Sequence, residues 1–204
     1  DLVGQTIIGG REGGMPELVL EYVLKKNGLD PEKDLTIITN LDLSATASAF
    51  VAGTGAYTTE FEPGATTLEE GDNGYVVASL GVDSGYVPYT VYMTTESILE
   101  EKEDLMQGFT NAIYKGQKWV EEHTSEEVAE VIHPQFEETS VETLTKIIER
   151  YQKQDTWKTD PVFSEESLRL IEDILREGGE YEGELAYEAI ANTSLAEKAM
   201  ESVS

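Results

Sequence analysis

The sequence predicts an α/β protein whose second half is almost wholly helical. In the first 94 residues, short β-branched runs alternate with the apolar spacing of helices, and short glycine-bearing turns separate them. Beyond residue 94, helical spacing continues without another clear strand pattern. Because strands that alternate with helices are typical of parallel βαβ units, we expect a parallel sheet followed by a helical layer.

The first predicted unit is a strand, a glycine loop and a helix. Thr6–Ile8 is a short β-branched run bounded by glycine, as buried strands often are. From Met15, apolar residues recur on one helical face, Pro16 suits a first helical turn, and Asn27-Gly28 supplies a stop. We therefore expect a helix between Met15 and that stop.

Three more strands and a helix follow at the short spacings that α/β connections prefer. The pattern predicts strands over Leu35–Thr39, Thr58–Glu62 and Tyr75–Leu80, and a helix over Ser44–Val51. Together these elements predict a complete α/β unit over residues 1–88.

The second predicted part, residues 89–204, has helices but no sheet. Helix starts are indicated at Ser97, Thr124 with Glu127, Ser140 and Ser164. Each helix has one apolar stripe, which must cover something. We therefore expect this chain to be part of a larger protein and to associate, through a second copy, swapped elements or a missing segment.

Composition argues against several classes of protein. The 204 residues carry 41 Asp+Glu and 14 Lys+Arg, a formal net charge of -27 that would repel nucleic acid and anionic lipid. There is no cysteine, and the two histidines lie ten residues apart, so a zinc site is not expected. No apolar stretch approaches the ~20 residues of a membrane span. We predict no cofactor, no metal and no nucleic-acid partner.

The glycine loop over residues 9–14 is either a ligand site or a plain tight turn. A strand-loop-helix unit aims backbone N–H groups and the positive end of the helix dipole at whatever lies in front of it. The nucleotide patterns GxxxxGK[ST] and GxGxxG do not fit these glycines. A small-ligand site remains, with Arg11 as a planar donor and Glu12 and Glu17 opposing a highly charged anion.

Two carboxylates form a second candidate feature. On the predicted strand, Glu60 and Glu62 share one face, and Pro63 then begins a short helix. Ligands of open α/β sheets collect at the carboxyl ends of strands, where the glycine loop also emerges. Each carboxylate is either a ligand group or a solvated side chain. An acid/base pair is disfavoured, because neighbours two residues apart lie side by side rather than across a substrate.

Three stretches carry a resemblance to a known family. They are GGREGGMPELVLEYVLKKNGLDPEKDLTI, TTEFEPGATTLEEGDNGYVVASLG and SGYVPYTVY, and QGFTNAIYKGQKWVEEH is similar to that family's following helix. In this order they resemble the periplasmic-binding-protein-like solute receptors of ABC importers, in the nitrate/sulfonate/taurine and thiamine-precursor (NMT1/THI5-like) branch.

The resemblance implies a type II periplasmic-binding-protein-like fold with two α/β lobes and a ligand bound between them. It implies that residues 1–88 are one complete lobe and residues 89–204 the crossing strand and C-terminal helices of the other, whose N-terminal segment is absent from this chain. The ligand-binding residues that it implies are Gly10, Arg11, Glu12, Gly13, Gly14, Met15, Glu62, Ser84, Tyr86 and Tyr89.

The implied role is non-catalytic capture of a small organic solute, such as a sulfonate, taurine or an amino-pyrimidine, for delivery to ABC permease subunits. The expected location is the extracellular or periplasmic face of the membrane, with a lipid anchor outside this chain. Two alternatives stay open: a pyrimidine-precursor synthase-like enzyme and a ligand-sensing module of a signalling protein. Arg11 against Glu62 pairs a donor with an acceptor, which favours a zwitterion or amino-heterocycle over nitrate.

Overall fold

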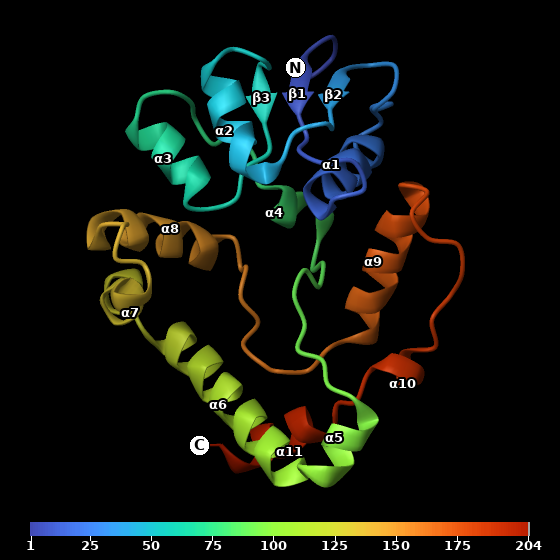
Figure 1. Ribbon diagram of the computed structural model, residues 1–204, viewed down its shortest axis with the longest axis vertical. Coiled ribbons are helices and arrows are strands. Elements are labelled where there is room, and N and C mark those ends of the chain that lie inside the picture. The colour runs from blue at the N-terminus through green and yellow to red at the C-terminus, as the bar shows by residue number, and fades with distance from the viewer. Residues whose placement is uncertain (204) are drawn as a thin grey trace. The chain divides into compact units, whose positions relative to one another are not determined.

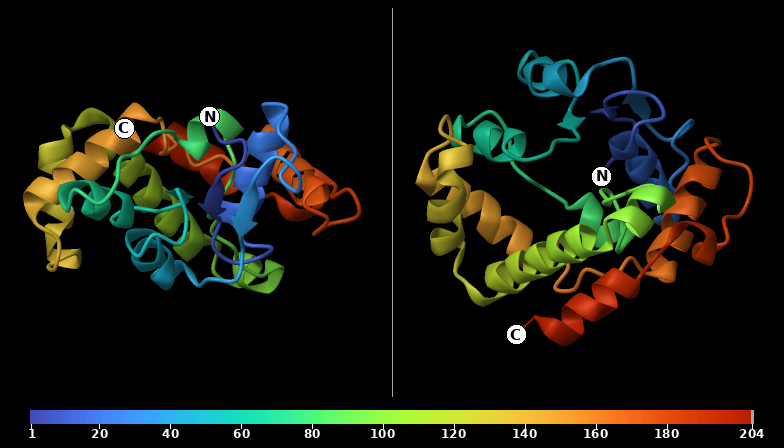
Figure 2. Two further views of the ribbon diagram at one scale, coloured as in Figure 1. Left: turned by 90° about the horizontal axis from the view of Figure 1, so that it is seen from above. Right: turned by 60° about the horizontal axis from the view of Figure 1, so that its bottom comes forward.

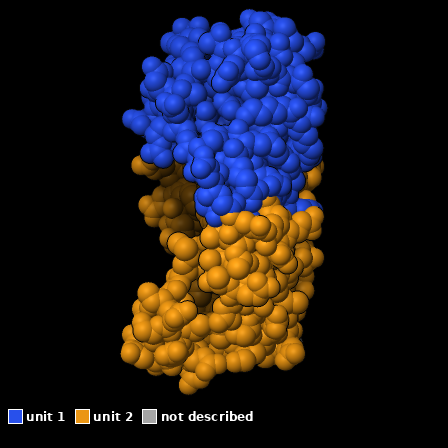
Figure 3. All heavy atoms as spheres, turned by 90° about the vertical axis from the view of Figure 1, so that its right-hand side faces the viewer, with its two compact units in different colours: residues 1–87, 170–183 blue, residues 88–169, 184–204 orange. Residues whose placement is uncertain are grey.

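The computed structural model describes residues 1–203, which form two compact units. Unit 1 contains residues 1–87 and 170–183, and unit 2 contains residues 88–169 and the described residues from 184 onward (Figure 3). The chain therefore passes from one unit to the other three times. One passage lies inside a single helix, α9 (Glu165–Glu177).

A small parallel sheet forms the centre of unit 1. Its strands are β1 (Thr6–Ile8), β2 (Thr36–Ile38) and β3 (Tyr57–Thr58), in the order β2-β1-β3 (Figure 1). β1 is central and runs parallel to both neighbours. The predicted parallel α/β arrangement of the first half is confirmed at this level, with strands shorter than the sequence pattern suggested.

Four helices of unit 1 follow the strands. They are α1 (Met15–Lys26), α2 (Leu43–Val51), α3 (Gly64–Glu70) and α4 (Leu80–Ser84). The expected boundaries of α1 are confirmed: Pro16 lies in the first turn, and Asn27 caps the C-terminus before Gly28, whose φ is +79°.

Helix α1 is buried on two sides, which explains its largely apolar sequence. One side packs on the sheet and the other on the C-terminal half of α9. The sheet-side cluster consists of Ile7, Leu20, Leu24 and Leu35, and the α9-side cluster consists of Leu18, Val19, Val23 and Ile174. Residues 170–183 thus belong to unit 1 because their apolar stripe covers α1.

Two predicted strands differ from the structure. β3 ends at Thr58, so the prediction of a strand over Thr58–Glu62 is wrong beyond its first residue. Tyr75–Leu80 forms no strand, and its Tyr75 and Val77 side chains are 82% and 74% exposed. The apolar pattern predicted a strand, but the segment has no sheet partner among the described residues.

The regular secondary structure of unit 2 is entirely helical among its described residues. Its helices are α5 (Glu96–Glu101), α6 (Glu103–Glu122), α7 (Ser125–Ile132), α8 (Val141–Lys153), the first turn of α9, α10 (Tyr187–Ile190) and α11 (Ser194–Ser202), with a 3₁₀ turn over His133–Gln135. Figure 2 shows α11 beside α6, and α7 packs on α8. The second pair buries Val128, Ala129, Leu144 and Ile148.

Most predicted helix starts in unit 2 are confirmed. Thr124 and Glu127 form a reciprocal capping box, and the Ser140 hydroxyl accepts from the N–H of Thr143. The Ser164 hydroxyl accepts from the N–H of Ser167 at the start of α9. Helix α5 is capped by Thr95 rather than by the predicted Ser97.

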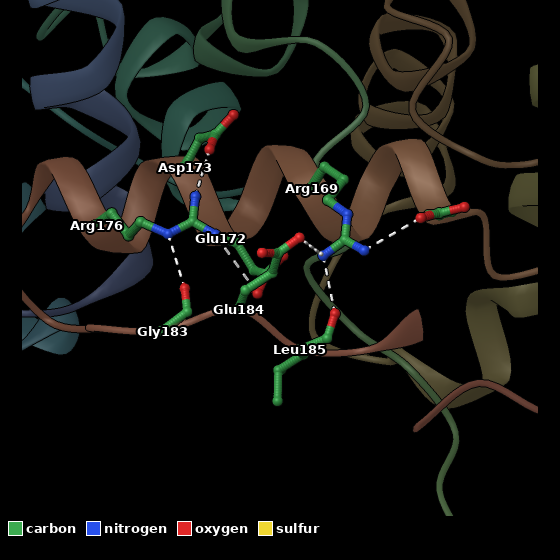
Figure 4. Close-up of polar contacts among 8 residues, drawn as sticks. Arg169, Glu172, Asp173, Arg176, Gly183, Glu184 and Leu185 are labelled. Carbon is green, nitrogen blue, oxygen red and sulfur yellow. Dashed lines mark hydrogen bonds and ion pairs between the residues drawn. The ribbon is translucent and has the colours of Figure 1, made fainter. Parts of the chain in front are cut away.

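Two arginines of α9 each hold a later stretch of chain within their own unit (Figure 4). In unit 2, Arg169 donates to the carbonyl of Leu185 (2.8 Å) and pairs with Glu165 (3.1 Å). In unit 1, Arg176 donates to the carbonyl of Gly183 (3.0 Å) and pairs with Glu172 (3.6 Å), whose side chain is buried. The polar side of α9 therefore fixes the segment that follows it.

Candidate ligand-binding site

The candidate site is the carboxyl edge of the sheet in unit 1. Because the three strands are parallel, the loops that follow them begin at one edge. These loops comprise residues 9–14 after β1, residues 39–42 after β2 and residues 59–63 after β3. The glycine loop is central among them, since β1 is the central strand.

Hydrogen bonds join the glycine loop to both neighbouring loops. On the β2 side, the N–H of Glu12 donates to the carbonyl of Thr39 (2.8 Å), and the N–H of Leu41 donates to the carbonyl of Gly10 (3.1 Å). On the β3 side, the Thr59 hydroxyl lies 3.2 Å from the carbonyl of Gly9. The glycine loop is therefore held by hydrogen bonds on two sides.

Backbone conformation accounts for the glycines of this loop. Gly10 and Gly13 have φ values of +100° and +68°, where side chains are disfavoured. A Cβ on Gly14 would lie 2.9 Å from the carbonyl oxygen of Arg11. These requirements agree with the tight-turn interpretation, which needs no ligand, so the glycines alone do not identify a site.

The N–H groups of Glu12, Gly13 and Gly14 in this loop are already engaged. The N–H of Gly13 donates to the carboxylate of Glu17 (3.2 Å), and the N–H of Gly14 donates to the carbonyl of Arg11 (2.9 Å). The N–H of Glu12 is used by Thr39, as described above. In this structure, a ligand would therefore meet few free backbone donors at Gly13 and Gly14.

Glu17 supplies the acceptor at the place where a ligand was expected to accept from the loop. Its side chain belongs to the first turn of α1 and is 6% exposed. Burial, followed by the charge of Glu21, raises the pKa of the Glu17 carboxyl, although the N–H of Gly13 lowers it. The charges of Glu12 and Glu180 also raise this pKa. The sequence showed that an acidic residue was near the loop, but not that it turns back onto it.

Glu180 is a neighbour that sequence reasoning missed. A Cβ built on Gly13 would lie 3.0 Å from its Oε1 atom, so the carboxylate lies close over the loop. It reaches the loop because residues 170–183 pack with unit 1. No local sequence signal connects residues that are so far apart along the chain.

Glu62 caps α3. Its two carboxylate oxygens accept from the N–H and the hydroxyl of Thr66, each at 3.0 Å, and the Glu62–Pro63 peptide bond is cis. Glu60 accepts from the Thr58 hydroxyl at 2.9 Å. Because β3 ends before both glutamates, the expectation that they share one strand face is wrong. Each carboxylate has a local structural partner.

Arg11 differs from these acidic groups. Its backbone forms an isolated antiparallel bridge with Asn40, and its side chain is exposed. Within residues 1–203 its guanidinium forms no ion pair and no side-chain hydrogen bond. Arg11 therefore offers a planar donor at the edge of the sheet.

The remaining predicted site residues have different environments. Met15 begins α1 and packs against the α9-side cluster. Ser84 is buried, and its hydroxyl lies 3.3 Å from the carbonyl of Gly85, at the end of α4. Tyr86 is 69% exposed in unit 1, and Tyr89 is 55% exposed in unit 2. Ligand contact by any of these residues stays a prediction.

Two kinds of feature are absent from residues 1–203. No group of three or more His, Cys, Asp or Glu side chains is arranged to hold a metal ion. None of the described helices combines the length and the apolar character needed to cross a membrane.

In open α/β proteins with a small parallel sheet, ligands collect at the loop-lined carboxyl edge. The model of the NMT1-like family matches residues 5–133, and the chain belongs to that family. Over 197 residues it is 42% identical to a Bacillus subtilis (strain 168) protein named "Putative binding protein YtlA". That match covers 97% of this chain and 59% of YtlA.

A solved structure supports the fold. A protein from Bordetella bronchiseptica RB50 matches with a TM-score of 0.62 at 16% identity, over 98% of this chain and 65% of that chain. At this identity the likeness concerns the fold alone. The chain spans about three fifths of the length of the relatives that it matches. The comparisons thus confirm the NMT1-like resemblance, and the α/β fold is consistent with that of a solute-binding protein.

Proposed function

We propose that this chain is part of the solute-binding component of an ABC importer. Membership of the NMT1-like family, a relative named as a binding protein and an α/β fold with a loop-lined edge support the binding role. The importer, its permease subunits and a lipid-anchored location on the extracellular or periplasmic face are inferred from the family resemblance. Capture would be non-catalytic and would be followed by delivery to the permease.

The ligand class that the site fits best is a small organic molecule carrying an amine or amino-heterocycle. The observation that supports this choice is the bond from the N–H of Gly13 to Glu17, because it takes a donor that an anion would need. Glu12 and Glu180 add negative charge beside the same loop. Hydrogen-bond acceptors and negative charge favour a ligand with N–H groups over nitrate or a simple sulfonate.

Arg11 supplies the complementary contact. Its exposed guanidinium can donate to a ring nitrogen, carbonyl or acidic group on the same ligand. A ligand that combines N–H donors with one acceptor would satisfy both the acidic side of the loop and Arg11. This arrangement suits amino-pyrimidines and zwitterions, including taurine, whose amine would face the carboxylates.

A synthase-like enzyme is less well supported. Glu60 and Glu62 were the candidate acid/base pair, and each is engaged by a neighbouring threonine hydroxyl, that of Thr58 or Thr66. Neither glutamate lies on a strand, so the shared strand face on which the proposed pair was based does not exist. The binding role therefore remains the preferred function.

The experiment is a thermal-shift screen of the purified protein against amino-pyrimidines, zwitterions, nitrate and simple sulfonates. A ligand at a hundred times its Kd should stabilise the protein by ~2.7 kcal/mol, which corresponds to roughly 5–10 °C for a chain of this size. Arg11→Ala should reduce the shift, and Lys115→Ala, which removes an exposed cation in unit 2, should not. Stabilisation by nitrate or simple sulfonates alone would contradict the proposed ligand class.

A further inference from the structure

The chain contains two Asn-Gly pairs, Asn27-Gly28 and Asn73-Gly74. An asparagine that precedes a glycine can react without an enzyme. The backbone nitrogen of the glycine attacks the side-chain carbonyl carbon of the asparagine, and the glycine has no Cβ to obstruct the approach. Both asparagines are exposed, so exposure does not distinguish the two pairs. They differ instead in the hydrogen bonds of the two groups that must meet.

The first pair is held at the C-terminus of α1. The N–H of Gly28 donates to the carbonyl of Lys25 at 2.9 Å. The side-chain nitrogen of Asn27 donates to the carbonyl of Val23, also at 2.9 Å. Attack by the Gly28 nitrogen on the Asn27 side chain would have to break both bonds. Because both bonds stabilise the unreacted arrangement, they should slow the reaction at Asn27 by about tenfold or more.

The second pair lies just beyond α3, in the connection from α3 to α4 (Figure 1). The N–H of Asp72 donates to the carbonyl of Glu69 at 3.1 Å. The N–H of Asn73 donates to the carbonyl of Leu68 at 2.9 Å. These two bonds form a Schellman motif, in which Asp72 has a φ of +53°. The end of α3 therefore uses the N–H groups up to Asn73 and no further one.

Neither reacting group of the second pair forms a hydrogen bond within residues 1–203. These groups are the N–H of Gly74 and the side-chain amide of Asn73. The amide lies over its own turn, since a Cβ on Gly71 would be 2.6 Å from its Nδ2 atom. A Cβ on Gly74 would lie 2.9 Å from the Cε1 atom of Phe50, so packing favours glycine at this position. The pair thus combines a required glycine with an asparagine side chain that no hydrogen bond holds.

We propose that Asn73 is a site of spontaneous modification in the folded protein, where it is converted to aspartate and isoaspartate. The nitrogen of Gly74 loses its proton and forms a bond to Cγ of Asn73. The bond from Cγ to Nδ2 breaks, and ammonia leaves with the proton that the nitrogen lost. The cyclic succinimide that results is opened by one water molecule at either of its carbonyls. One opening gives aspartate, and the other gives isoaspartate, in which the backbone runs through the side-chain methylene.

The conversion should weaken the C-terminal end of α3. Both products add a negative charge next to Asp72, where the helix dipole disfavours anions. Isoaspartate also lengthens the backbone between Glu69 and Val76. The N–H of Val76 donates to the Glu69 carboxylate at 2.9 Å, so a longer backbone between them disturbs this contact. We therefore expect modified protein to have a loosened last turn of α3 and an unchanged α1.

The test is timed incubation of the purified protein at mildly alkaline pH, with and without guanidinium chloride, followed by peptide mass spectrometry. Replacement of the amide NH₂ by OH raises the mass of the peptide, and an isoaspartyl methyltransferase detects isoaspartate. In the folded protein, Asn73 should be converted about tenfold or more faster than Asn27. In denaturant, where the α1 hydrogen bonds are lost, this ratio should fall towards one. Asn73→Gln is the control, because its longer side chain forms the cyclic intermediate much more slowly.

Several results would overturn the proposal. Equal rates at Asn27 and Asn73 in the folded protein would show that the hydrogen bonds do not control the reaction. An Asn73 that is converted only in denaturant would show that its turn protects it. The same ratio with and without denaturant would assign the difference to neighbouring residues rather than to the fold. Amide hydrogen exchange tests the consequence: faster exchange in α3 of the modified protein supports it, and unchanged exchange there excludes it.

Discussion

The contact between Glu17 and the glycine loop gives a prediction with a distinctive pH dependence. Glu17 is 6% exposed, accepts from the N–H of Gly13 at 3.2 Å, and has a raised pKa because of burial and the charge of Glu21. Glu17→Gln keeps the shape and an oxygen that can accept from Gly13, but removes the charge. Glu17→Ala removes both the charge and the acceptor.

The sign of the pH effect follows from the raised pKa. A carboxyl whose folded pKa exceeds its unfolded value contributes stability below the unfolded pKa, and loses that contribution as pH rises through the folded pKa. A glutamine side chain does not titrate, so a variant with glutamine at this position does not lose stability in this way. Glu17→Gln should therefore gain stability relative to the wild type as pH rises from about 4.3 into the neutral range. At lower pH, where both side chains are neutral, the two proteins should be similar.

The Glu17→Ala variant measures how much the hydrogen bond from Gly13 to Glu17 stabilises the fold. Leaving the N–H of Gly13 without an acceptor should cost about 1–3 kcal/mol. For a chain of this size, each kcal/mol lowers the melting temperature by about 2–4 °C. Because neither variant carries a charge at position 17, the alanine variant should melt below the glutamine variant by that amount across the pH range.

The assay is thermal unfolding of the three proteins between pH 4 and pH 8, with amide hydrogen exchange in β1 to identify the transition of unit 1. The reasoning is refuted if the difference between the wild type and Glu17→Gln does not change across this range. It is also refuted if the glutamine variant is less stable than the wild type at neutral pH.

Three other predictions concern stability. Gly9→Ala would place a Cβ 2.6 Å from the Cγ2 atom of Ile37 and should cost about 1–3 kcal/mol of stability. A Cβ on Gly108 would meet nothing within 4 Å, so Gly108→Ala should stabilise α6 by about 0.5–1 kcal/mol. Equal melting temperatures for the two variants would contradict this prediction. Thr66→Val removes the hydroxyl that donates to Glu62 at 3.0 Å and should cost about 1 kcal/mol in denaturant unfolding, so an unchanged midpoint would rule out this cap as a stabilising contact. With a net charge of -27, added salt should raise the melting temperature at neutral pH, and a fall would exclude self-repulsion as a major cost.

The sequence predicted best those elements whose signals are local. Pro16 and Asn27-Gly28 bound α1, and Thr124 with Glu127 forms the predicted capping box, because caps depend on neighbouring residues. The strand over Tyr75–Leu80 was predicted wrongly, since a strand needs a partner that its own residues do not specify. Local patterns therefore predicted α1, the starts of several later helices and the positions of three strands along the chain, but not the order or the extent of the sheet.

The candidate site was predictable in position but not in its contacts. The glycine loop after β1 was located correctly, because parallel strands bring their loops to one edge. The return of Glu17 onto Gly13 and the approach of Glu180 depend on how α1 and residues 170–183 pack together. Sequence spacing could not show that the donors expected to face a ligand are engaged within the protein.

The most direct measurement of the central claim is titration calorimetry of the wild-type protein and Arg11→Ala with an aminopyrimidine and with nitrate. The account predicts measurable binding of the aminopyrimidine to the wild type, weakened about tenfold or more by Arg11→Ala through loss of a charged hydrogen bond. It predicts no comparable binding of nitrate. Tighter binding of nitrate than of the aminopyrimidine, or aminopyrimidine binding that Arg11→Ala leaves unchanged, would contradict it.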